Sequence, residues 1–72
     1  MTLAGLTVGL VNHLAVVNLR LALLEGSEPQ AAATAALDLV KRLLLEAGMG
    51  EQEAEVVLVS ARQLVETVLE HL

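Results

Sequence analysis

Several residue classes are missing or scarce in this 72-residue chain. It has no cysteine, which excludes disulfide bonds and thiolate metal sites. It has no phenylalanine, tyrosine or tryptophan to stack on a base, and only four Lys and Arg residues. Nine Asp and Glu residues give a net charge of −5 at pH 7. Because nucleic-acid binding requires a basic surface, we expect no nucleic acid as a partner.

Apolar side chains are what the chain has in abundance. Hydrophobic residues make up 56% of it and charged residues 18%. A chain of this length buries only about 60% of its unfolded surface on folding. Small domains usually need a disulfide, a metal, very regular helix packing or oligomerisation to stay folded. Of these, oligomerisation fits the composition best, so we expect residues 1–72 to form one domain within a homo-oligomer.

The segment 3–24, LAGLTVGLVNHLAVVNLRLALL, is apolar on almost every side of a helical wheel. A helix of this kind must be covered on all sides, by a protein core, a bilayer or other copies of the chain. Its length would suffice to span a membrane. Against a span, Asn12, His13 and Arg20 are costly in lipid, and an aromatic belt is missing. The segment also lacks the positively charged start of a signal peptide, so we expect soluble, cytoplasmic expression.

Glycines divide the chain into three predicted helices, at about residues 2–25, 28–47 and 51–72. Gly26 and Gly48 are predicted to take the left-handed conformation that ends a helix. Turns of two or three residues force consecutive helices to run antiparallel. The predicted fold class is therefore all-α, a three-helix protomer with short glycine-containing turns.

Capping residues support the starts of these helices. Thr2 is the predicted N-cap of the first helix and Gly50 of the third. Ser27 and Gln30 predict a capping box at the second helix, in which Ser27 caps and Gln30 reaches back to it.

Unusual positions on each helix indicate surfaces for other copies of the chain. Gly5 and Gly9 permit another backbone to approach closely, and Leu45 interrupts an otherwise polar side of the second helix. The third helix carries a strip without charge beside its predicted core, which is typical of an interface. The predicted oligomer interface contains Gly5, Val8, Gly9, Asn12, His13, Val16, Leu45, Val56, Val59, Ser60, Gln63 and Thr67.

Asn12 and Asn18 are the polar residues of the first helix whose burial would cost the most free energy. A buried asparagine needs hydrogen-bond partners, and one polar residue in an apolar seam can fix the register and number of subunits. We expect one or both to bond to a helix end or to another subunit. The alternative is that they contact solvent on a partly exposed face.

No group of residues predicts a reaction. His13 has no acidic or histidine neighbour at metal-site spacing, and Ser60 has no neighbouring base on its helix. Glu55 and Glu66 share a side with Arg62 between them, which indicates a salt-linked surface rather than an acid–base pair. We therefore expect no enzyme activity, no metal or cofactor, and no small-molecule substrate.

The regular pattern of capping box, glycine turns and three similar helices resembles computationally designed helical proteins. Within that class, a short helical chain with this excess of apolar surface resembles the subunits of designed rings and polyhedral nanocages. The resemblance implies self-assembly into a closed symmetric homo-oligomer. The separate exceptions on the second helix (Leu45) and the third helix (Val56 and Val59) indicate more than one type of interface. Two alternatives remain, a helical module that binds a different protein and a small membrane-inserted helical protein.

Overall fold

A computed structural model describes the backbone of residues 3–72 and the side chains from Thr7 onward. It contains three α-helices: α1 (Leu3–Leu24), α2 (Pro29–Glu46) and α3 (Glu51–Glu70). The prediction of an all-α, three-helix protomer is confirmed. The predicted N-cap Thr2 lies outside the described residues.

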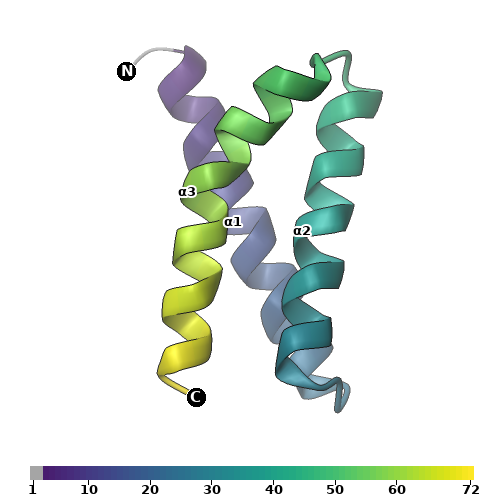
Figure 1. Cartoon of the computed structure of the whole chain (residues 1–72), viewed down its shortest axis with the longest axis vertical. Coiled ribbons are helices and arrows are strands. Elements are labelled where there is room, and N and C mark those ends of the chain that lie inside the picture. Colours follow the sequence, from purple (N-terminus) through teal and green to yellow (C-terminus); the bar gives the residue numbers. More distant parts are fainter. Residues whose placement is uncertain (1–2) are drawn as a thin grey trace.

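Consecutive helices run antiparallel, so α1 and α3 point the same way (Figure 1). In that view α1 lies behind the other two helices and crosses them at an angle, from the upper left to the lower right. Each helix packs against both of the others. The Cα atoms span 34 × 23 × 16 Å, so three helices share one small core.

Two glycine turns join the helices. Gly26 (φ +91°) and Gly48 (φ +97°) both adopt the left-handed conformation, as predicted. After α1, the Ser27 N–H donates to the Ala22 carbonyl at 3.0 Å and the Gly26 N–H donates to the Leu23 carbonyl at 3.1 Å. The same pair of bonds follows α2, from Met49 to Leu44 and from Gly48 to Leu45. This pattern satisfies carbonyls that a helix end would otherwise leave unpaired.

The predicted capping box at α2 is wrong in its capping residue. Glu28, not Ser27, is the N-cap, and its Oε2 accepts from the Ala31 N–H at 3.1 Å. The capping carboxylate thus comes from the residue after Ser27. Pro29 then occupies the first helical position, where no N–H is needed. The third helix begins after Gly50, as predicted, without a side-chain cap.

The core is built mainly from alanine. Of the eleven buried hydrophobic residues described, six are alanines and only Leu19 and Leu58 are larger than valine. The full set is Val11, Ala15, Leu19, Ala32, Ala33, Ala36, Val40, Ala54, Leu58, Ala61 and Val65. Because alanines project little from a helix, the three helices can lie close together. The core that results has room for few of the chain's leucines.

We predict that Gly48→Ala lowers the free energy of unfolding by about 1 kcal/mol, since a Cβ is strained at φ +97° even though nothing lies near it. Gly9→Ala is the matched control, because Gly9 is inside α1 and its Cβ would also meet open space. Gly9→Ala should raise stability by about 0.5–1 kcal/mol. Urea unfolding followed by circular dichroism measures both, and equal effects of the two substitutions would contradict the turn geometry.

Candidate interaction surfaces

Many large apolar side chains are exposed, although five leucines and two valines pack half-buried against the core. The chain exposes 4862 Å² of accessible surface, where a folded monomer of 7.6 kDa is expected to expose about 4,300 Å². The exposed large hydrophobic residues are Leu10, Val17, Leu21, Leu24, Leu39, Leu43, Leu45, Val56, Val59, Leu64 and Leu72. Isolated exposed leucines are common on soluble proteins, but contiguous ones mark interaction sites.

The first contiguous group lies along α1. Leu10, Leu14, Val17, Leu21 and Leu24 follow one another at spacings of four, three, four and three residues, and we call this set the α1 ridge. Its members Leu10, Leu21 and Leu24 are 55%, 52% and 84% exposed, while Leu14 is half-buried. This spacing is the a/d repeat of a coiled-coil seam. Sequence reasoning missed the ridge, although its signal, the 4–3–4–3 spacing of leucines and valine, was present.

Apolar residues of α2 extend this surface. A groove between α1 and α2 is lined by Leu21 and Glu25 on one side and by Ala35 and Leu39 on the other. Leu43, one turn beyond Leu39, is 44% exposed. The α1 ridge and the near side of α2 thus form one apolar surface across two helices.

The second group lies on α3. Val56 and Val59 are 73% and 54% exposed, and Gln63 and Thr67 are exposed beside them. We call these four residues the α3 strip. The Thr67 hydroxyl donates to the Gln63 carbonyl at 3.0 Å, so part of its polarity is satisfied within the helix. All four were among the predicted interface residues, and the strip is open to a partner.

The other predicted interface residues are placed differently. Gly9 and His13 are exposed, as is Leu45 at 40%, while Val8, Asn12 and Val16 are half-buried. Gly5 lies within α1, but its exposure is outside the described part of the chain. Apart from the adjacent backbone of α1, no described atom lies within 4 Å of a Cβ built on Gly9, so no close helix crossing at this glycine is seen in the described part of the chain. Their role at an oligomer interface stays a prediction.

The two asparagines have partners inside the chain. The Asn12 Nδ2 group donates to the Ser60 hydroxyl oxygen at 3.1 Å, which links α1 to α3. The Asn18 Nδ2 group donates to the Leu14 carbonyl of its own helix at 2.8 Å. Each amide group thus has a partner inside the chain that was not predicted, and a bond from either asparagine to another subunit stays a prediction. Asn12 Oδ1 is buried without a hydrogen bond to any described residue.

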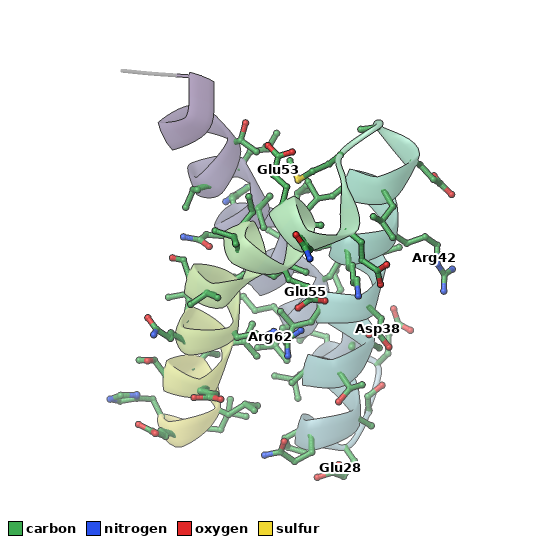
Figure 2. The ribbon with its side chains drawn as sticks, turned by 45° about the horizontal axis from the view of Figure 1, so that its top comes forward. Glu28, Asp38, Arg42, Glu53, Glu55 and Arg62 are labelled. Atoms are coloured by element: carbon green, nitrogen blue, oxygen red, sulfur yellow. The ribbon has the colours of Figure 1, made fainter. Side chains whose placement is uncertain are left out.

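Ion pairs fasten α2 to α3. Lys41 Nζ lies 2.6 Å from Glu55 Oε1 and 3.8 Å from Glu51, and Arg62 lies 3.1 Å from Glu55 Oε2. Glu55 and Arg62 therefore face α2, while Asp38 and Arg42 lie on the outer side of α2 (Figure 2). The predicted ion pair between Glu55 and Arg62 is present, but the sequence did not predict that Lys41 of α2 joins it. Spacing along one helix cannot show which residue of a second helix lies opposite.

The hydrogen bond with Lys41 is the main cause that lowers the pKa of Glu55 below its ordinary value of 4.5. Partial desolvation opposes this shift, and the charges of Lys41 and Arg62 add to it. The same hydrogen bond raises the pKa of Lys41 above 10.5. Both groups are therefore charged across the neutral range, and their role is to hold two helices together.

The described residues bring together no obvious reactive group. A groove between α2 and α3 is lined by Arg62, Glu66 and Glu70 opposite Gln30 and Thr34, all of them exposed. No three His, Asp or Glu side chains in the described part of the chain are close enough to hold a metal ion. His71 Nδ1 lies 2.7 Å from the Thr67 carbonyl at the end of α3.

Comparisons with protein-family models, with curated proteins and with solved structures find no match to this chain. One described helix, α1 from Thr7 to Leu24, is long and apolar enough to cross a membrane, judged by length and composition alone. Of that window, 17% is buried inside the fold. Most of this apolar window is therefore not buried by the chain's own fold.

We predict that Ser60→Ala destabilises the fold by about 1 kcal/mol, because it removes the partner of the Asn12 amide. Adding Asn12→Leu to Ser60→Ala should restore most of this loss, since no polar group is then left unpaired. Chemical unfolding of the single and double variants measures both values. A double variant as unstable as the sum of the two single variants would contradict this reading of the Asn12 site.

We also predict that Lys41→Met raises the pKa of Glu55 towards 4.5, with Lys41→Arg as the control that keeps the charge. In the wild-type chain the pair stabilises the fold above pH 4.5 and loses this effect as pH falls through the lowered pKa of Glu55. NMR titration of the Glu55 carboxyl carbon gives the pKa directly. An unchanged value in Lys41→Met would show that Lys41 is not its partner in solution.

Proposed function

We propose that this chain is a structural protein that assembles with copies of itself into a closed, symmetric homo-oligomer, and that it has no catalytic activity. The single observation that supports this most is the distribution of apolar residues. Alanine dominates the core, while leucines and valines lie exposed in contiguous groups on α1 and α3. Burying one such leucine or valine contributes about 1.5–3 kcal/mol, so association would recover stability that the lone fold lacks.

The two groups favour more than one type of interface. The α1 ridge and the α3 strip lie on different helices, and Asn12 and Ser60 connect those helices between them. One kind of self-complementary contact closes at a dimer, whereas two kinds on one chain extend the assembly to dihedral or polyhedral arrangements. The resemblance to designed cage and ring subunits supports the same proposal.

Two alternative functions predict different results for the purified chain. A module that binds another protein would leave the α1 ridge uncovered in the pure chain, which would then aggregate. A membrane protein would place α1 in lipid, in keeping with its length and hydropathy. Arg20 and the half-buried Asn12 and Asn18 within the same window argue against lipid, because polar groups there are costly.

Size-exclusion chromatography with light scattering, in buffer without detergent, tests the proposal. We expect one discrete mass that is a multiple of 7.6 kDa. Leu21→Glu on the α1 ridge and Val56→Glu on the α3 strip should each reduce this mass, because each would place a charge in an apolar contact.

Thr34→Glu is the matched control, since it adds the same charge at an exposed position of α2 outside both surfaces. It should leave the mass unchanged. A wild-type chain that runs as a single 7.6 kDa species at all concentrations contradicts self-assembly. Polydisperse aggregates, or material recovered only in detergent, favour the rivals.

A further inference from the structure

We propose that the α1 ridge pairs in parallel with the α1 ridge of a second copy, as a two-stranded coiled-coil seam about a twofold axis. This inference rests on the proposed function and specifies one of its interfaces. Leu10, Val17 and Leu24 occupy the d positions of the repeat, and Leu14 and Leu21 occupy the a positions. The seam runs for two full heptads along α1. Its d positions and Leu21 are exposed, while Leu14 at its middle is half-buried and also packs against the core.

The charges beside the seam select the occupant and its direction. Arg20 directly precedes the a position Leu21, which makes it a g residue, and Glu25 directly follows the d position Leu24, which makes it an e residue. In a parallel pair, a g residue faces the e residue five positions further along the partner helix. Arg20 of each copy would therefore face Glu25 of the other, and the twofold axis would form this ion pair twice.

Both charges are available for such a contact. Arg20 and Glu25 are exposed, and neither takes part in the ion pairs that the described residues form within the chain. Glu25 directly follows the last residue of α1, and its N–H still donates a helix-type hydrogen bond to the Leu21 carbonyl at 3.1 Å. The α1 ridge thus has a complementary charge pair at its C-terminal end that only a second molecule can complete.

An antiparallel pair would lack this complementarity. In that arrangement g residues face g residues, so Arg20 would meet the region of His13 in the partner and Glu25 would meet no cation. A different protein as occupant would also leave the match between Arg20 and Glu25 without a reason. A second copy in parallel orientation accounts for the leucine spacing and for both charges.

Charge reversal followed by mixing tests the pairing. Alone, Arg20→Glu and Glu25→Arg should each weaken association by about tenfold, because each replaces two attractive contacts by two repulsive ones. Mixed in equal amounts, the two variants should regain the wild-type association, since both intermolecular contacts are then attractive again. Analytical ultracentrifugation at low salt measures this, with Arg42→Glu on the outer side of α2 as control.

A mixture that associates no better than either variant alone overturns the proposal. An ion pair within one chain could not be restored by mixing, so this result separates the two cases. Circular dichroism checks that each variant is helical; both positions are exposed, so we expect the fold to be retained.

Direction is tested by cysteine cross-linking, which is unambiguous because the chain has no cysteine of its own. In a parallel pair two copies of Leu24→Cys lie side by side and should form a disulfide-linked dimer on mild oxidation. In an antiparallel pair residue 24 lies opposite residue 10, and the two copies of residue 24 are about 21 Å apart. Cross-linking only between Leu24→Cys and Leu10→Cys chains would overturn the parallel arrangement.

Failure of this inference can be told apart from failure of the proposed function. A discrete oligomer that ignores the charge reversals and forms no Leu24→Cys cross-link refutes the seam but keeps self-assembly. A monomer refutes both. Flotation of the wild-type chain with phosphatidylcholine vesicles, in place of a discrete soluble particle, assigns the α1 ridge to lipid and also overturns the seam.

Discussion

Close packing of alanines between three helices is the constraint on which the rest of this structure depends. The core cluster contains Ala15 of α1, Ala32, Ala33 and Ala36 of α2, and Ala61 of α3, and Ala54 of α3 is also buried. Small residues allow helices to approach closely, but each contributes little apolar surface to the core. Five leucines pack half-buried against this core, and others are exposed on the α1 ridge and its neighbours on α2.

The polar contacts fit this arrangement of the helices. Lys41, Glu55 and Arg62 join α2 to α3 at their partly exposed edge, and Asn12 joins α1 to α3 through Ser60. These contacts fix how the three helices sit against one another, because charged and hydrogen-bonding groups tolerate few alternative positions. They leave the α1 ridge and the α3 strip without polar cover. The apolar surfaces are thus held in defined positions, which the proposed interfaces between subunits would require.

Local sequence signals predicted the helices and turns well, and spatial neighbours poorly. Gly26 and Gly48 end helices because a positive φ suits glycine, which is a property of each residue alone. The N-cap of α2 is Glu28 and not the predicted Ser27, because local rules place the start of a helix only within a residue or two. The Lys41–Glu55 pair and the Asn12–Ser60 bond join different helices, so no spacing along the chain reveals them. The α1 ridge was hidden because α1 is apolar at other angles as well.

We propose that the folded chain depends on its copies for stability, because few large apolar side chains are fully buried in its own core. Thermal unfolding followed by circular dichroism over a hundredfold range of protein concentration tests this most directly. If assembly and folding are coupled, the unfolding midpoint rises with concentration, because association stabilises the folded state by mass action. A midpoint that is high and the same at every concentration would show that the alanine core suffices alone, and would contradict the account.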